Sequence, residues 1–255
     1  MKSGVVAFLT GLLIFFGLET MLFFPKFFYL PLGLMNLAIV FSIYLLAREK
    51  RLDWTWINFS FLPLIFVNSL VLACGLIPQI TFWNKLLLQA IFCSAIYFFL
   101  FYARNLWLFF NFPERPNNLN NFSLGLAIVT AFFCSSSIFG LQLFLNLPYL
   151  VLTIIISVLL VILIFCNLWI AGLASRELWS LLLVLFFIFI QIIWTLYFLP
   201  FDYNAIAFIM TLVFYLSLNL VRLNLRQTLN RYNLKPLLIY AVAVFVIILA
   251  TVRWR

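Results

Sequence analysis

Residues 4–24 read GVVAFLTGLLIFFGLETMLFF, and this stretch decides the fold. About 20 consecutive apolar residues form a helix long enough to cross the ~30 Å hydrocarbon core of a bilayer. The stretch carries a single charge, that of Glu19. A carboxylate costs roughly 2–4 kcal/mol near the bilayer centre and less towards its edge. Glu19 is therefore the strongest indication of a site in the sequence.

The composition of the whole chain points to the same class of protein. Of its 255 residues, 67% are hydrophobic and 8% are charged, whereas soluble domains carry about 25% charged residues. Only helices or a closed barrel satisfy the backbone in lipid. Barrel strands alternate polar and apolar residues over about ten positions, but the apolar runs here continue for about 20 without alternation. The sequence therefore predicts an all-α, polytopic membrane protein.

Nine apolar segments are predicted to span the membrane. Short connections containing Pro25, Pro148 and Pro200 follow the first, fifth and seventh segments, and proline suits tight turns between helices. The chain is thus interpreted as four hairpins plus a final helix, forming one transmembrane domain over residues 1–255. Residues 104–121 and 222–235 are predicted to be cytoplasmic or interfacial connections. The predicted spans are residues 4–24, 27–47, 56–76, 83–103, 122–146, 149–173, 178–199, 204–222 and 236–252.

The distribution of basic residues predicts the orientation. Eleven of the 15 lysines and arginines fall on the side of the N-terminus and four on the other side. Cytoplasmic loops carry an excess of Lys and Arg, so the N-terminus is predicted to be cytoplasmic and the protein to lie in the cell membrane. Nine spans then place the C-terminus outside. Arg253 and Arg255 fit that side poorly, so eight or ten spans remain alternatives.

The net charge of +9 does not indicate nucleic-acid binding, because the cations lie between the apolar spans. Orientation and anionic lipid headgroups account for them there. The chain has no histidine, which removes histidine-based metal and haem sites. Its four cysteines fall inside predicted spans and form no CxxC pair, so they are interpreted as packing residues. No cofactor or metal is expected.

Amide and acid side chains gather towards the predicted outer leaflet. Polar residues within spans usually face protein or water. The candidate binding residues are Glu19, Gln89, Gln142, Gln191 and Asn68, which would line an outward-facing polar pocket. The alternative is that the amides only join helices, at roughly 0.6–2 kcal/mol each.

The first span places Gly11, Phe15 and Glu19 on one face, at a spacing of four residues. Glycine permits close approach of another helix, so this face is expected to point into the bundle. The predicted partners of Glu19 are Lys85, Lys26 or the glutamines. An ion pair with Lys85 would be structural, whereas a carboxylate without a cation could carry a proton.

A stripe on the eighth span consists of Thr211, Tyr215 and Asn219. It could line a path through the membrane, although such stripes more often form buried helix contacts.

The connection VRLNLRQTLNRYNLK places Arg222, Arg226 and Asn230 four residues apart, with Leu225 and Leu229 on a neighbouring face. This pattern is typical of a helix lying in the headgroup layer. Membrane lipids are accordingly the expected partners. The residues predicted to contact lipid headgroups are Arg222, Arg226, Arg231 and Lys235.

Three hypotheses follow for the function. The first is a small carrier with an outward polar pocket around Glu19. The second is a structural or assembly subunit, in which polar residues join helices and other membrane subunits are partners. The third is a lipid-handling membrane enzyme, which ranks last because the chain lacks GxSxG, HExxH and P-loop motifs.

Overall fold

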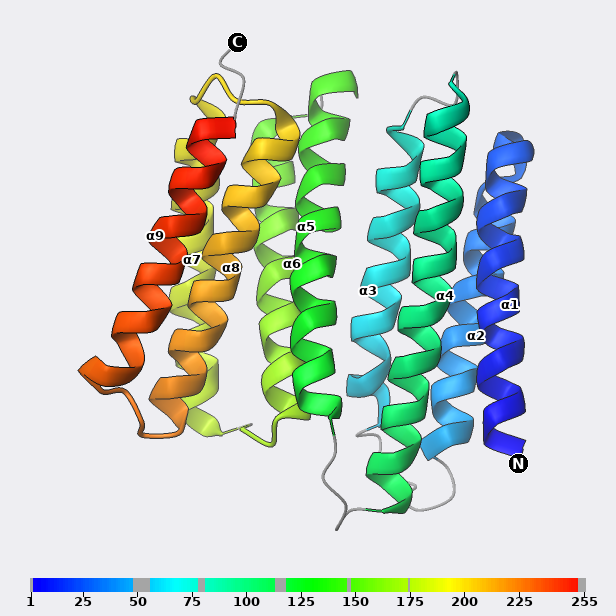
Figure 1. The fold of residues 1–255 in the computed structure, drawn as a ribbon, viewed down its shortest axis with the longest axis horizontal. Coiled ribbons are helices and arrows are strands. Elements are labelled where there is room, and N and C mark those ends of the chain that lie inside the picture. Colours follow the sequence, from blue (N-terminus) through cyan, green and yellow to red (C-terminus); the bar gives the residue numbers. More distant parts are fainter. Residues whose placement is uncertain are drawn as a thin grey trace. The chain divides into compact units, whose positions relative to one another are not determined.

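The computed structural model describes residues 2–47, 56–77, 81–112, 118–145, 148–173 and 175–251. Within these ranges it contains nine α-helices and one short 3-10 turn (Figure 1). All nine helices are long and apolar enough to cross a membrane. The all-α fold and the predicted number of spans are therefore confirmed for the described part of the chain.

The chain divides into two compact units, residues 1–126 and 127–255. The first unit contains α1 (Lys2–Phe23), the turn η1 (Pro25–Phe27), α2 (Tyr29–Ala47), α3 (Trp56–Gly75), α4 (Phe82–Asn111) and the beginning of α5 (Leu119–Leu145). Helix α1 packs against α2 and α4, and α2 packs against α3. The second unit contains the rest of α5, α6 (Tyr149–Ile170), α7 (Arg176–Tyr197), α8 (Tyr203–Leu225) and α9 (Arg231–Thr251). There, α7 packs on both α6 and α8, and α8 packs on α9.

Gly11 lies at the contact between α1 and α4, as its shared face with Glu19 predicts. A Cβ atom added at Gly11 would lie 3.2 Å from Ile96 Cγ2 and 3.5 Å from Leu100 Cδ2. Farther along α1, a Cβ atom at Gly17 would lie only 2.5 Å from Met35 Sδ of α2. Both glycines therefore let neighbouring helices approach α1 closely.

Pro63 lies inside α3 and is buried. Proline has no N–H, so the carbonyl oxygen four residues earlier, that of Phe59, lacks its usual helical donor. The hydroxyl of Tyr102 on α4 donates a hydrogen bond of 2.8 Å to this oxygen. Tyr102 is fully buried. The side chain of a neighbouring helix thus satisfies the backbone group that proline leaves open, as apolar surroundings require.

The helix boundaries differ most from the predicted ones at two places, the end of α4 and the connection from α8 to α9. Helix α4 has 30 residues, Phe82–Asn111, and so continues eight residues past the predicted span. At 1.5 Å per residue it measures about 45 Å, more than the hydrocarbon thickness. The predicted headgroup helix over 222–235 is not continuous, because α8 runs to Leu225 and α9 begins at Arg231. Gln227 between them has a φ of 57°, a left-handed conformation that ends a helix.

Candidate functional site

Glu19 and Gln89, two of the predicted site residues, lie together. The side-chain Nε2 of Gln89 on α4 donates a hydrogen bond of 2.5 Å to Oε1 of Glu19 on α1. Glu19 is half-buried and Gln89 is exposed, so the pair lies at the surface of the first unit. Among the described residues, no ion pair joins Glu19 to Lys85 or Lys26. The partner of the carboxylate is therefore the amide, one of the alternatives that the sequence left open.

An apolar hollow of about 360 Å³ lies between α1, η1 and α2. Thr20 is one of its lining residues, but Glu19 is not. Thr20 donates its hydroxyl to the carbonyl of Gly17 within its own helix, over 2.9 Å. The hollow thus has almost no polar group to offer, and a binding role for Glu19 remains a prediction.

Asn68 on α3 forms a reciprocal amide pair with Asn36 on α2. Each Nδ2 donates to the Oδ1 of the other, over 2.9 Å from Asn68 and 3.2 Å from Asn36. Asn68 also donates to the carbonyl of Leu64, over 2.7 Å. These contacts join two helices, in agreement with the alternative interpretation of the amides as helix contacts.

Gln142 and Gln191 belong to the second unit. Gln142 is half-buried on α5, and Gln191 is exposed on α7. Because Glu19 lies in the first unit, a pocket that these glutamines share with it remains a prediction.

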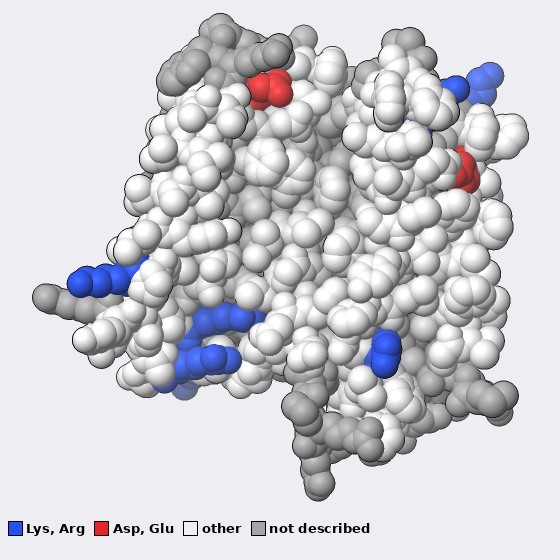
Figure 2. Space-filling view, viewed as in Figure 1, with Lys and Arg blue, Asp and Glu red and all other residues white. Residues whose placement is uncertain are grey.

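The residues predicted to contact headgroups have different environments. Arg222 is 9% exposed and donates a hydrogen bond from Nη2 to Oδ1 of Asn167 on α6. Arg226 and Lys235 are exposed, whereas the side chain of Arg231 lies outside the described part of the structure. Figure 2 shows basic side chains at the end of the second unit where α8 ends and α9 begins. Arg222 thus forms its hydrogen bond inside the second unit, whereas Arg226 and Lys235 are exposed.

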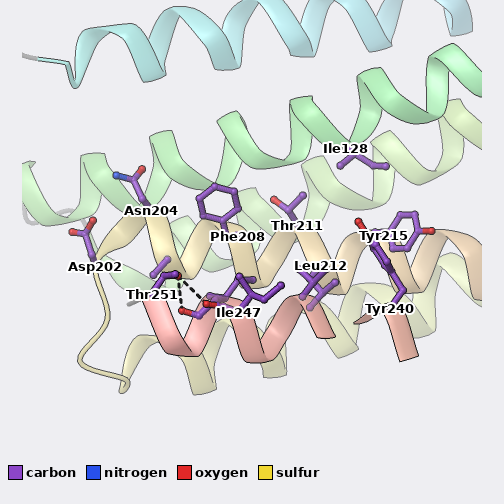
Figure 3. A pocket seen from close by; sticks show the side chains of 13 residues that line it. Ile128, Asp202, Asn204, Phe208, Thr211, Leu212, Tyr215, Tyr240, Ile247 and Thr251 are labelled. Atoms are coloured by element: carbon purple, nitrogen blue, oxygen red, sulfur yellow. Dashed lines mark hydrogen bonds between the residues drawn. The ribbon is translucent and has the colours of Figure 1, made fainter. Parts of the chain in front are cut away.

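A groove that was not predicted lies in the second unit. It has a volume of about 970 Å³ and lies between α8 and α9, bordered by Ile128 of α5 (Figure 3). We call it the α8–α9 groove. Its lining residues recur on one face of each helix, at intervals of three and four. They are Asp202, Asn204, Ala205, Phe208, Thr211, Leu212 and Tyr215 from α8 and its N-cap, and Tyr240, Val244, Ile247, Ile248 and Thr251 from α9.

Polar side chains occupy one end of this groove, where Asp202, Asn204 and Thr251 lie (Figure 3). Ser136 on α5 donates a hydrogen bond of 2.8 Å to Oδ1 of Asn204. This bond fixes the side chain of Asn204, and its Nδ2 is a donor at the mouth of the groove. The hydroxyl of Thr251 donates to the carbonyls of its own helix and can still accept a hydrogen bond.

The middle of the groove is apolar, and two tyrosines close its other end. Phe208 is 51% exposed and packs against Phe132 of α5, with ring centroids 4.5 Å apart. The rings of Tyr215 and Tyr240 meet edge to face, with centroids 5.8 Å apart. The groove extends along α8 from Asn204 to Tyr215, a distance of roughly 16 Å at 1.5 Å per residue. That is about half of the ~30 Å hydrocarbon core.

The stripe on the eighth span accounts for only part of this groove. Thr211 and Tyr215 line it, whereas Asn219 donates to the carbonyl of Tyr215 within α8, over 2.8 Å. Asn204 and Tyr240 were not among the predicted site residues. A signal existed in the four-residue spacing of Tyr240, Val244 and Ile248, but it resembles any apolar helix face.

Comparison with protein-family models, with curated proteins and with solved structures finds no match to this chain. Its apolar helices support an integral, multi-pass membrane protein. Any more specific function has to be argued from its own residues.

Proposed function

We propose that this membrane protein binds a lipid-like amphiphile in the α8–α9 groove, as the binding step of a small carrier. The observation that carries the proposal is the groove itself, about 970 Å³ in volume, polar at one end and apolar along its middle. Ligand pockets typically measure 300–1,000 Å³ and combine apolar walls with a few polar groups. The length of roughly 16 Å matches one leaflet of a bilayer.

The first experiment tests whether the groove is occupied. A photoactivatable alkyl diazirine alcohol is added to the protein in nanodiscs, and the labelled peptides are identified by mass spectrometry. Thr211→Trp fills the groove from α8 and should abolish labelling of α8 and α9. Leu220→Trp, on the same helix but outside the groove, is the control and should leave labelling unchanged. Equal labelling of both variants contradicts the proposal.

The second experiment tests whether the protein carries the amphiphile. A fluorescent amphiphile is followed between the leaflets of proteoliposomes, with the same two variants. Transfer that is lost in Thr211→Trp and kept in Leu220→Trp supports a carrier. Labelling without transfer supports a lipid-binding role, including the lipid-handling enzyme considered above.

We further propose that the N-terminus is cytoplasmic and that the protein lies in the cell membrane. The basic residues support this orientation, and exposed Arg226 and Lys235 would then contact anionic headgroups. The mouth of the groove, at Asp202, would open at the outer surface. Cysteine substitutions at 202 and 226 test this in intact cells. Position 202 should react with an impermeant maleimide, and position 226 only after lysis; the reverse result contradicts the orientation.

A second candidate function is a subunit of a membrane assembly, and the Glu19–Gln89 pair favours it. Lipid tails offer no donor to a carboxylate, whereas another membrane protein could. Cys93 is exposed and lies one turn from Gln89 on α4. Cross-linking at Cys93 in membranes should then give a discrete larger product, which Glu19→Leu should remove. A product that survives this substitution contradicts a role for the pair.

A further inference from the structure

The inner end of the α8–α9 groove carries two tyrosine hydroxyl groups, one from each helix. Tyr215 is the thirteenth residue of α8, which has 23 residues, and Tyr240 is the tenth of the 21 in α9. Both tyrosines line the groove. Among the described residues, neither hydroxyl has a hydrogen-bond partner. A hydroxyl without a partner in apolar surroundings is unfavourable, by roughly 1–3 kcal/mol on mutational scales.

Water and headgroups are distant from the hydroxyl of Tyr215. Tyr215 lies roughly 18 Å along α8 from its first residue, Tyr203, and roughly 15 Å from its last, Leu225, at 1.5 Å per residue. A tyrosine near the end of a span can reach the interface with its hydroxyl, but one at mid-span depth cannot. A polar atom of the occupant would satisfy this hydroxyl, and the same atom could reach the hydroxyl of Tyr240, because the two rings are in contact.

We propose that the ligand of the α8–α9 groove is polar at both ends: an elongated amphiphile whose tail carries a hydroxyl or carbonyl oxygen. This inference rests on the proposed function. The head would bind at the mouth, where Asn204 offers a donor, and the apolar chain would follow Phe208 and Leu212. The tail oxygen would bind the hydroxyls of Tyr215 and Tyr240. Ordinary acyl chains end in a methyl group and leave these hydroxyls unsatisfied.

The test compares two neutral probes that differ only at the tail, dodecan-1-ol and dodecane-1,12-diol. Their binding to the protein in nanodiscs is measured by displacement of a fluorescent amphiphile. The measured quantity is the ratio of the two affinities, in the parent protein and in Tyr215→Phe and Tyr240→Phe. Different partitioning of the probes into the bilayer affects every variant equally, so it cancels when these ratios are compared.

Removing one tyrosine hydroxyl should reduce the relative affinity for the diol roughly two- to twelvefold, the effect of one hydrogen bond. Affinity for dodecan-1-ol should be unchanged. Tyr232→Phe is the control, because Tyr232 lies in α9 but outside the groove. If both probes bind and no tyrosine variant changes the ratio, the inference is wrong and the proposed function stands. If neither probe binds, both are wrong.

Discussion

Replacing Tyr102 with phenylalanine should destabilise the first unit, because it removes the donor that compensates for Pro63. The hydroxyl of Tyr102 is the atom that donates to the carbonyl of Phe59. The substitution leaves this carbonyl buried beside a proline that cannot bond to it. An unsatisfied buried acceptor costs about 1–3 kcal/mol, so the free energy of unfolding should fall by that amount.

The same reasoning predicts that the cost depends on Pro63. In a Pro63→Ala background, the N–H of residue 63 can donate to the carbonyl of Phe59. Tyr102→Phe should then cost less by at least about 1 kcal/mol, a coupling typical of residues that share a hydrogen-bond partner. Unfolding by a denaturing detergent in bicelles, followed by circular dichroism, measures the four free energies.

Tyr97→Phe is the matched control. Tyr97 lies on the same helix but is 62% exposed, so its substitution should change stability by less than about 0.5 kcal/mol. If Tyr102→Phe costs the same in both backgrounds, the hydroxyl does not compensate for the proline and the reasoning fails.

Two further predictions concern helix packing in the first unit. Gly11→Leu should lower the free energy of unfolding by roughly 1–3 kcal/mol, because the leucine side chain would overpack against α4. Gly4→Leu is the control and should be close to neutral, since nothing lies within 4 Å of a Cβ atom added at that position. Equal effects of the two substitutions in the same unfolding assay would contradict the close contact at Gly11. Asn68→Leu should lower the free energy of unfolding by about 0.6–2 kcal/mol, because it leaves Asn36 without its partner. Replacing both Asn36 and Asn68 with leucine should recover part of that stability. Additive effects in the double-mutant cycle would show that the two side chains are not coupled.

The spans could be predicted because each follows from local composition. Long apolar runs bounded by proline or charged residues predicted the helices of the described part of the chain. The errors lie at helix boundaries, where the change in composition is gradual. The aromatic residues after Arg104 belong to α4, although the span was predicted to end at residue 103. The predicted headgroup helix near Arg226 is interrupted by Gln227, which has a left-handed conformation. The spacing of apolar and basic residues does not by itself show at which residue a helix ends.

The candidate site could be predicted only in part. Glu19 stands out by charge, and its partner Gln89 was among the alternatives, because the two share a depth. The α8–α9 groove depends on how α8 packs against α9, so its tyrosines resemble ordinary helix residues until the two faces are brought together. The role of Tyr102 depends likewise on the position of Pro63 in another helix.

The α8–α9 groove is open along its length, since Phe208, Tyr240 and Ile247 are all more than half exposed. A ligand can therefore enter sideways from the lipid phase rather than from water. Its occupancy would follow its mole fraction in the membrane, so adding more lipid at a constant total amount of ligand should dilute the ligand and weaken apparent binding. Affinities measured in nanodiscs and in cells become comparable only when they are expressed per lipid.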